Sequence, residues 1–530
     1  MDFMKLLQKN EVSYSDNGAA MYKTSGHKLL DLNFNIISLR NRSIAHDDIW
    51  QEYAIVLKEN PIYALKWLLF LRDIRGGVGE REVFRNLFHN ALLYYTQLDI
   101  SKLINYVAEY GRWDDIVDIF FRVKEDDRNN FVNDKEDIAN LLLDAILNQL
   151  KADEEALANK EYRKISLLAK WLPSRKTSSI KSRKRAIFFI HTLKISEKSY
   201  RKKLVALRKG LNIVEQLMCD NKWQDINYSV VPSRANLSYH SAFFKHDPQG
   251  YKTYLDNVKA NKAKINVQAL YPHEIVHKYY DSVRYSDSPL LKYNESIELM
   301  WKSLSKPTNF KDTLVVRDGS ASMLSFIRNN KCSMLEVADA LTLYCAENNK
   351  SEHFKNKFIT FSSLPQIINV SATCTLQDKL NILDQYHDYS NTNIEAVFDL
   401  ILNAAQKNHV SQESLPKNIL IISDMQFDYA STTTVNSTLF ETINEKFSKA
   451  KYKMPKLIFW NLCGHTSAIP MQENENGVIL LSGFSISLLE MVCSSEIDPL
   501  KCLYKVLDKE RYSIIDKLYP SSNTLNEKIA

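Results

Sequence analysis

The spacing of apolar residues changes once along this chain, near residue 301. Before that point apolar side chains recur every three or four positions, which is typical of amphipathic helices. After it, short apolar runs alternate with helical patterns, which predicts a doubly wound, mostly parallel sheet covered by helices. The expected strands lie at 313–316, 357–361, 419–423, 456–460 and 478–481, and the expected helices at 334–347, 393–407 and 439–449.

The composition favours helices over turn-rich β folds. Only 12 glycines and 13 prolines occur in 530 residues, whereas the hairpins of a sandwich or barrel would consume more glycine. With 45% hydrophobic and 25% charged residues and a net charge of +6, the chain has an ordinary globular composition. This excludes fibrous, disordered and disulfide-scaffold classes, and the length suggests about two to four domains.

A domain boundary is expected near Lys306-Pro307, where the pattern changes. We expect a helical domain over 1–300 and an α/β domain over 308–495. Apolar residues continue at helical spacing after Asp498, which predicts a helical extension over 496–530 that packs back on the helical domain.

Two helical hairpins are expected in the first part of the chain. Apolar residues recur at helical spacing over 61–72 and again over 84–95, on either side of a glycine turn at Gly77. A similar pair of patterns flanks Gly111, and 111 − 77 places the two turns 34 residues apart. That interval is typical of helical repeats, in which each hairpin buries its apolar face against the next. We therefore expect a HEAT-like helical-repeat solenoid or ring.

Charge is distributed unevenly along the helical part. Acidic residues dominate between Glu125 and Glu155, whereas Lys and Arg dominate from Arg163 to Lys209, where Glu197 is the only acid. A concentrated positive face attracts polyanions and releases phosphate counterions on contact, which favours nucleic acid as a partner. The alternative is that these cations pair with the preceding acidic segment or line a contact between domains. The candidate RNA-binding residues are Arg175, Lys176, Lys181, Arg183, Lys184, Arg185, Arg201, Lys202 and Lys203.

Three oxygen-bearing side chains follow the first expected strand. Asp318, Ser320 and Ser322 occupy alternate positions at the carboxyl end of that strand, the edge where α/β sheets bind ligands. Carboxylate and hydroxyl oxygens are the ligands that Mg²⁺ prefers. The segment therefore predicts a site for Mg²⁺, or Mn²⁺. The alternative is that the serines cap the next helix and that the acids open turns.

This D-x-S-x-S segment resembles the metal-ion-dependent adhesion site of von Willebrand A domains. Two further residues of the motif follow in the family's order. Thr392 precedes a helix, and Asp424 directly follows the strand at 419–423; the nearby Asp428 is an alternative to Asp424. The glycines that often precede the threonine in the family are replaced here by Ser390 and Asn391.

The resemblance implies a role for each residue. Ser320 and Ser322 would coordinate the ion directly, joined by Thr392 in one state, while Asp318 and Asp424 would act mostly through waters. It also implies that an acidic residue of a protein partner completes the coordination.

A helical domain followed by such a domain resembles the Ro autoantigen architecture, a helical ring called the TROVE module joined to a von Willebrand A domain. The segments 70–81, 170–174, 231–235 and 271–274 are similar to those of an uncharacterised family of cellular and viral proteins with this architecture. For Ro-like proteins the resemblance implies binding of structured or misfolded RNA.

A motif that suggests a different function is the H-E-x-x-H sequence formed by His273, Glu274 and His277. Two histidines one helical turn apart, with a glutamate as general base, are typical of zinc hydrolases. The region offers no evident third ligand, however, and Pro272 marks a helix start at which these residues could act as caps.

The remaining features indicate a reducing, non-membrane environment. The cysteines include no C-x-x-C pair, which argues against disulfides and structural zinc, and no long apolar segment suggests a membrane span. We therefore expect a cytoplasmic, non-catalytic RNA-binding scaffold with a Mg²⁺-dependent site for a protein partner. One alternative is a protein-interaction module that uses the metal site without RNA, and another is a metal-dependent hydrolase.

Overall fold

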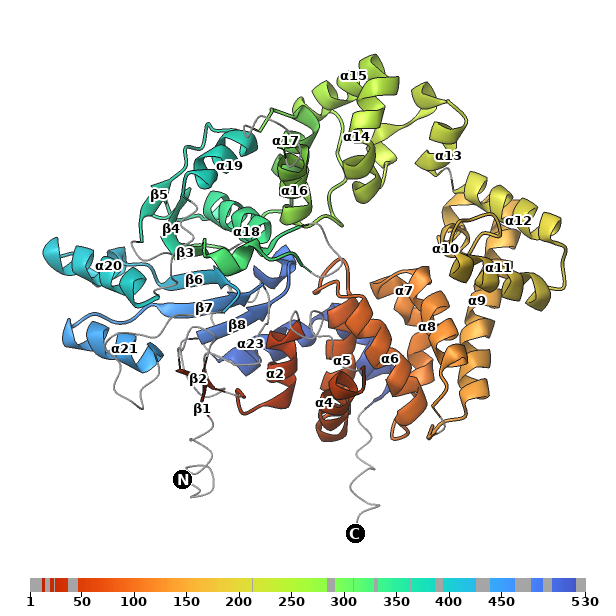
Figure 1. Ribbon diagram of the computed structural model, residues 1–530, viewed down its shortest axis with the longest axis horizontal. Coiled ribbons are helices and arrows are strands. Elements are labelled where there is room, and N and C mark those ends of the chain that lie inside the picture. The colour runs from red at the N-terminus through yellow and green to blue at the C-terminus, as the bar shows by residue number, and fades with distance from the viewer. Residues whose placement is uncertain are drawn as a thin grey trace, which may run out of the picture. The chain divides into compact units, whose positions relative to one another are not determined.

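The computed structural model describes residues 12–14, 20–22, 24–36, 46–128, 130–211, 213–283, 291–307, 309–327, 332–361, 365–386, 394–425, 439–462, 478–489 and 498–520. The chain divides into two compact units, and Figure 1 labels most of their helices and strands. The sheet unit comprises Met1–Ala64 and Val267–Ser513, and the helical unit comprises Leu65–Asn266 and Ile514–Ala530.

The sheet unit contains a six-stranded mixed sheet in the order β5-β4-β3-β6-β7-β8. The strands are β3 (Thr313–Asp318), β4 (Lys357–Phe361), β5 (Ile367–Asn369), β6 (Asn418–Ser423), β7 (Lys456–Asn461) and β8 (Val478–Ser482). All neighbouring pairs are parallel except β4 and β5. The predicted doubly wound α/β sheet is therefore confirmed. The sequence does not predict β5, because this edge strand buries only Ile368 and forms no apolar run.

The chain changes direction across the sheet between β3 and β6. From β3 it continues to β4 and β5 on one side, and from β6 to β7 and β8 on the other. In open α/β sheets, ligands bind outside the carboxyl ends of the strands at such a switch point. β3 ends at Asp318 and β6 ends at Ser423, so both strands bring polar residues to this position.

Helices cover the sheet and one another. The elements are α18 (Met334–Asn348), α19 (Leu376–Asp384), α20 (Ile394–Lys407) and α21 (Leu439–Lys449), with α2 (Lys28–Phe34) and α23 (Pro499–Leu507) beside β8. α18 packs against β3, β4 and β6 and is buried from Met334 to Ala346. α20 packs against β4 and α21. The remaining N-terminal elements of this unit are the hairpin of β1 (Val12–Tyr14) and β2 (Ala20–Tyr22), and α4 (His46–Glu59), which packs on α2.

Two helices that precede the predicted boundary belong to the sheet unit. α16 (Pro272–Val283) packs on α18, and α17 (Glu295–Lys302) packs on α16 and α19. The buried Glu298 of α17 accepts hydrogen bonds from the backbone N–H groups of Leu376 (2.9 Å) and Gln377 (3.1 Å), at the start of α19. A carboxylate there satisfies helix N–H groups and favours the helix dipole. The compact unit therefore begins earlier along the chain than the change in apolar spacing near residue 301.

The helical unit consists of short and medium helices. They are the larger part of α5 (Pro61–Arg72), α6 (Glu82–Tyr94), η2 (Ile100–Tyr106), α7 (Val107–Tyr110), α8 (Trp113–Glu125), α9 (Lys135–Ala158), η3 (Tyr162–Lys164), α10 (Leu168–Trp171), α11 (Ile180–Thr192), α12 (Glu197–Gly210), α13 (Val214–Cys219), η4 (Trp223–Asp225), η5 (Tyr228–Val230), α14 (Ser233–His246), α15 (Pro248–Lys259) and α24 (Ile514–Leu518). α24 is fixed to this unit by an ion pair between Asp516 and Lys66 (3.1 Å). Tyr519, just after α24, donates a hydrogen bond to the carbonyl oxygen of Asp99 (2.7 Å).

Helices α5 and α6 flank the turn at Gly77, α7 and α8 flank the turn at Gly111, and a buried ion network joins the two pairs. Asp115 of α8 accepts hydrogen bonds from Arg72 of α5 and Arg85 of α6, each at 2.8 Å. Glycine is needed at both turns, because a Cβ at Gly77 would lie 2.1 Å from the Phe70 carbonyl oxygen and one at Gly111 would lie 2.4 Å from Asp115. The predicted mainly helical region is therefore confirmed, but the helix expected around Leu103 and Ile104 is instead the 3₁₀ segment η2 followed by the single turn α7.

Candidate divalent-ion site and basic surface

The first candidate site lies at the switch point of the sheet unit. Arg317 pairs with Ile422 in the ladder between β3 and β6, so Asp318 and Ser423 end neighbouring strands and Asp424 follows directly. Asp318 and Asp424 are 0% and 1% exposed. The structure thus brings together two carboxylates that are 106 residues apart in sequence, counted as 424 − 318.

Hydrogen bonds hold the segment after β3 in place. The Ser320 N–H donates to one Asp318 carboxylate oxygen (2.9 Å), and the Ser423 hydroxyl donates to the other (2.5 Å). The hydroxyls of Ser320 and Ser322 lie 3.0 Å apart. Neither the start of η6 (Ala321–Leu324) nor that of α18 is capped by the Ser320 side chain, because η6 has no side-chain cap and Ser333 caps α18. The hydroxyls of Ser320 and Ser322 remain close to the buried carboxylates and suited to a shared ligand.

The electrostatics of this site favour a cation. Burial and the nearby Asp424 raise the pKa of Asp318 to about 7. Two buried carboxylates cannot both ionise without a compensating charge, and a divalent ion supplies it. The set of carboxylate and hydroxyl oxygens suits Mg²⁺ or Mn²⁺. The residues present therefore fit the ion that the sequence predicts. Thr392, together with Ser390, Asn391 and Asp428, lies outside the described residues.

The H-E-x-x-H residues do not gather around one point. Glu274 accepts a hydrogen bond from the Tyr271 N–H (2.9 Å) at the start of α16, as a capping residue does. His273 stacks on the Tyr271 ring, with centroids 5.5 Å apart, and meets Phe484 edge-on. His277 instead contacts Glu336 of α18. This arrangement does not favour a hydrolase built from His273, Glu274 and His277.

A different group of possible ligands surrounds His277. Within the described part of the chain, ligand atoms of His277, Cys332 and Glu336 all lie within 4.8 Å of one another. Local sequence motifs do not reveal this group, because His277 and Cys332 are 332 − 277 = 55 residues apart. The spacing of Cys332 and Glu336, one helical turn apart around the start of α18, is the only local signal.

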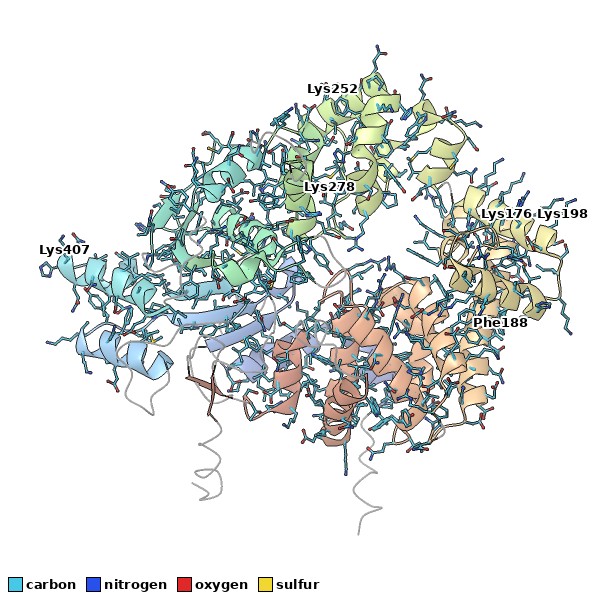
Figure 2. All side chains as sticks on the ribbon, in the orientation of Figure 1. Lys176, Phe188, Lys198, Lys252, Lys278 and Lys407 are labelled. Atoms are coloured by element: carbon cyan, nitrogen blue, oxygen red, sulfur yellow. The ribbon has the colours of Figure 1, made fainter. Side chains whose placement is uncertain are left out.

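The second candidate site is the basic surface, which we define as the exposed cations Lys176, Lys181, Lys184, Lys198, Arg201 and Lys202 of the helical unit. Lys198, Arg201 and Lys202 share one face of α12, at positions i, i+3 and i+4, while Tyr200, Leu204 and Leu207 are buried. None of these six cations forms an ion pair with any residue that the structure describes. Figure 2 shows the side chains of this region, with Lys176 and Lys198 labelled.

The other candidate RNA-binding residues have partners within the helical unit. Arg185 pairs with Asp118 of α8 (3.0 Å), and Lys203 pairs with Glu154 of α9. Arg175 pairs weakly with Glu197 (3.4 Å), and Arg183 donates to the Thr177 carbonyl oxygen (2.9 Å). Among the residues that the structure describes, the acidic segment 125–155 therefore pairs with one of the nine candidates, Lys203.

The fold and the site geometry together define a protein with a mainly helical unit and an α/β unit that carries a buried carboxylate pair at its switch point. Comparisons with known proteins place the boundary between two family matches at residue 312, within the sheet unit. Residues 181–312 match a domain of unknown function, DUF2828, and residues 312–510 match another, DUF7788. The basic residues from Lys181 onwards fall in the first match, and Asp318 and Asp424 fall in the second.

A viral protein resembles this chain over almost its whole length. The uncharacterized protein L728 of Acanthamoeba polyphaga mimivirus is 28% identical over 545 residues, which cover 97% of this chain and 90% of that protein. Among solved structures, the Ro (RSR) protein of Deinococcus radiodurans aligns with 90% of this chain and 93% of its own, at 10% identity and a TM-score of 0.35. None of the described helices is both long and apolar enough to span a membrane.

Proposed function

We propose that this protein is a non-catalytic RNA-binding scaffold whose sheet unit carries a divalent-ion site for a protein partner. The observation that supports RNA binding best is the basic surface of the helical unit. Its cations are exposed and form no ion pair with described residues, so phosphates can reach them without first breaking a salt bridge. The resemblance of the domain order to the Ro architecture implies RNA in particular among polyanions.

The basic surface offers phosphate contacts more than base contacts. The nearby aromatic Phe188 packs against Phe120 and Phe121 (centroids 5.2 and 5.6 Å apart) and lies under Lys124. Since this ring is used in packing, we expect binding to depend on the backbone and shape of the RNA rather than on stacked bases.

The RNA proposal is tested by removing four exposed cations from the full chain. Replacing Lys181, Lys184, Arg201 and Lys202 by Ser should weaken binding of a structured RNA, measured by fluorescence anisotropy over a series of salt concentrations. The log–log salt slope should fall by about 0.7–0.9 for each phosphate that is no longer bound.

A matched control removes the same charge elsewhere. Lys355, Lys407, Lys451 and Lys453 are exposed residues of the sheet unit, and changing all four to Ser lowers the net charge equally. We expect this control to retain most of the affinity and the slope. Equal affinity of the wild type and the first variant would contradict RNA binding at this surface.

The ion site is proposed to work as a docking point. An ion held by Asp318, Asp424, Ser320 and Ser322 can keep one coordination position for a carboxylate of a partner. Leu324 and Phe326, 46% and 62% exposed, follow the ion-binding segment and offer apolar contact area beside it. The buried carboxylate pair is the observation that supports the ion.

Mg²⁺ or Mn²⁺ should therefore stabilise the protein. At about 100 times Kd the ion should add about 2.7 kcal/mol to the free energy of unfolding, if the unfolded chain does not bind it. Asp318→Ala should remove this gain, while Glu352→Gln, which alters an exposed carboxylate, should keep it. Thermal unfolding with and without the ion measures both effects, and isothermal titration without binding heat in the wild type would refute the site.

A further inference from the structure

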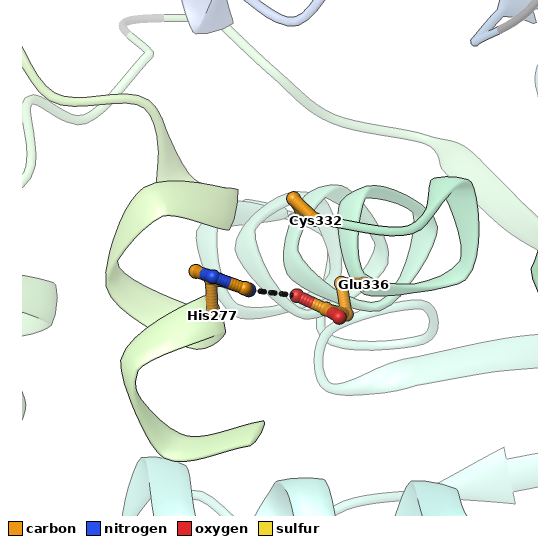
Figure 3. A group of neighbouring side chains, drawn as sticks. All are labelled: His277, Cys332 and Glu336. Carbon is orange, nitrogen blue, oxygen red and sulfur yellow. Dashed lines mark hydrogen bonds and ion pairs between the residues drawn. The ribbon is translucent and has the colours of Figure 1, made fainter. Parts of the chain in front are cut away.

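A group of unlike ligands lies between α16 and the start of α18, separate from the proposed Mg²⁺ site. Nδ1 of His277 and Oε2 of Glu336 are 2.5 Å apart, and the Cys332 sulfur completes a group whose ligand atoms all lie within 4.8 Å of one another. Figure 3 shows the three side chains gathered between the two helices. Cys332 is 1% exposed, and the side chains of Glu336 and His277 are 9% and 16% exposed.

The ligand types distinguish this group from the site at Asp318. An imidazole, a thiol and a carboxylate are the three side chains that bind Zn²⁺, whereas Mg²⁺ takes oxygen ligands. Zinc bonds of 2.0–2.3 Å in a tetrahedron place neighbouring ligand atoms about 3.3–3.8 Å apart. The distances between the ligand atoms of His277, Cys332 and Glu336, all within 4.8 Å, are compatible with a zinc tetrahedron if His277 and Glu336 separate by about 1 Å. The ion then replaces their hydrogen bond.

The surrounding structure holds the three ligands in position. Two backbone hydrogen bonds hold the segment around Cys332. The Ile327 N–H donates to the Cys332 carbonyl oxygen (3.0 Å), and the Met334 N–H donates to the Ser325 carbonyl oxygen (3.1 Å). The hydroxyl of Ser333 caps α18 by accepting from the Glu336 N–H (3.2 Å). Glu336 therefore stands at a fixed point in the first turn of α18.

A second contact, one helical turn further on, fixes α16 against α18. The Tyr280 hydroxyl donates to Asp339 (2.8 Å), and the same carboxylate pairs with the fully buried Arg317 of β3. His277 and Tyr280 are three residues apart on α16, as Glu336 and Asp339 are on α18. The two helices thus meet along a row of polar contacts, so the ligands are preorganised by groups that do not touch the ion.

We propose that His277, Cys332 and Glu336 bind a Zn²⁺ ion that clamps α16 to α18, with water in the fourth position. Binding requires the thiolate and a free lone pair on Nδ1 of His277. The Cys332 proton is therefore released to solvent, the proton of the hydrogen bond between His277 and Glu336 is displaced to Nε2 of the ring, and Zn²⁺ takes the place of both. The ion stabilises the folded sheet unit because these ligands converge only after α16 has packed on α18. The site uses one histidine of the H-E-x-x-H sequence, but neither His273 nor Glu274.

Co²⁺ is a suitable probe, because a cobalt–thiolate bond gives a charge-transfer absorption that oxygen ligands do not. The purified full chain is freed of metal with a chelator and titrated with Co²⁺. We expect one equivalent to produce the thiolate band and Zn²⁺ to abolish it. Cys332→Ser should lose the band. Cys345→Ser, which changes a buried cysteine within α18, should retain it. Asp318→Ala should also retain it, which separates this site from the proposed Mg²⁺ site.

Glu336→Gln gives a second measurement, because it preserves the size of the side chain. Changing even an outer-shell partner costs about 10–100-fold in metal affinity, so loss of a ligand should weaken Zn²⁺ binding by at least about tenfold. Zn²⁺ should raise the Tm of the wild type but not of Cys332→Ser. Absence of the thiolate band in the wild type, or an equal band in Cys332→Ser, would overturn the proposal.

Discussion

At the scale of single residues, the proposed ion site depends on how Asp318 and Asp424 tolerate burial. The strand ends place both carboxylates out of water, and Asp318 meets this cost by a raised pKa and by hydrogen bonds from Ser320 and Ser423. Without a metal ion, the proton is the cation that relieves the repulsion. A divalent ion and a proton therefore compete for the same carboxylates.

The stability of the metal-free protein should depend on pH with a defined sign. The folded pKa of Asp318, about 7, lies above that of an unfolded aspartate, about 4. The stabilisation from its bound proton is therefore fully present below about pH 4 and is lost as pH rises through about 7. Urea unfolding of the chelator-treated protein at several pH values measures this loss.

Asp318→Asn serves as the control for this pH effect, because it is neutral at every pH. The wild type should lose stability relative to this variant between about pH 4 and 7. Mg²⁺ affinity should change in the opposite direction, rising with pH up to about 7, because the ion binds the deprotonated pair. A Mg²⁺ affinity independent of pH over this range would contradict the competition.

At the scale of helices and strands, the turn after α5 shows how one backbone contact fixes a hairpin. The Val78 N–H donates to the Phe70 carbonyl oxygen (3.1 Å), which brings the turn back over α5 and leaves no room for a Cβ at Gly77. Arg72, Arg85 and Asp115 then join the hairpin to the next one.

Gly77→Ala should therefore destabilise the helical unit. Its Cβ would lie 2.1 Å from backbone that cannot move independently, and overpacking of this kind costs about 1–3 kcal/mol. Gly210→Ala is the matched control, because its Cβ would approach side-chain atoms alone: the flexible ends of Ile165 and Leu157 (2.9 Å each) and, at 3.4 Å, the Tyr162 ring. Alanine also favours the helix by about 1 kcal/mol. Chemical denaturation compares them, and a loss in Gly210→Ala as large as that in Gly77→Ala would contradict this argument.

Elements with a strong apolar pattern could be predicted from the sequence, and those fixed by distant contacts could not. The helices at Pro61–Arg72 and Leu439–Lys449 have the predicted bounds, because proline, glycine and periodicity all act locally. The short α19 has a local start signal that the sequence prediction missed, a capping box of Thr375 and Asp378. Its first N–H groups are also accepted by Glu298 of α17, a partner 376 − 298 = 78 residues away. No local pattern contains that contact.

The same distinction holds for the candidate sites. The meeting of Asp318 and Asp424 was predictable, since residues at the carboxyl ends of strands share one edge of a parallel sheet. The sequence could not predict which cations remain exposed. Arg185 pairs with Asp118 and Lys203 pairs with Glu154, and both ion pairs depend on how the helices that carry them pack. The group of His277, Cys332 and Glu336 likewise depends on the packing of α16 against α18.

At the scale of the whole molecule, the two proposed activities belong to different compact units. The basic surface lies within the helical unit and the proposed Mg²⁺ site within the sheet unit. Coupling between two sites requires an element with two arrangements whose equilibrium both ligands shift. Cations that contact phosphate through exposed side chains need no rearrangement of the sheet, and an ion bound between β3 and β6 needs none in α11 or α12.

RNA and Mg²⁺ should therefore bind independently. In the combined variant, the changes that Asp318→Ala and the fourfold Lys/Arg→Ser variant each cause in the free energy of RNA binding should add within about 0.5 kcal/mol, as expected for sites without shared partners. RNA affinity should be unchanged by Asp318→Ala, and Mg²⁺ affinity should be the same with and without saturating RNA, since linkage makes any coupling reciprocal. Titrations of each ligand in the presence of the other measure this, with ionic strength held constant because both bind through charge. A reciprocal change of fivefold or more, equivalent to about 1 kcal/mol, would show instead that the two units respond to each other.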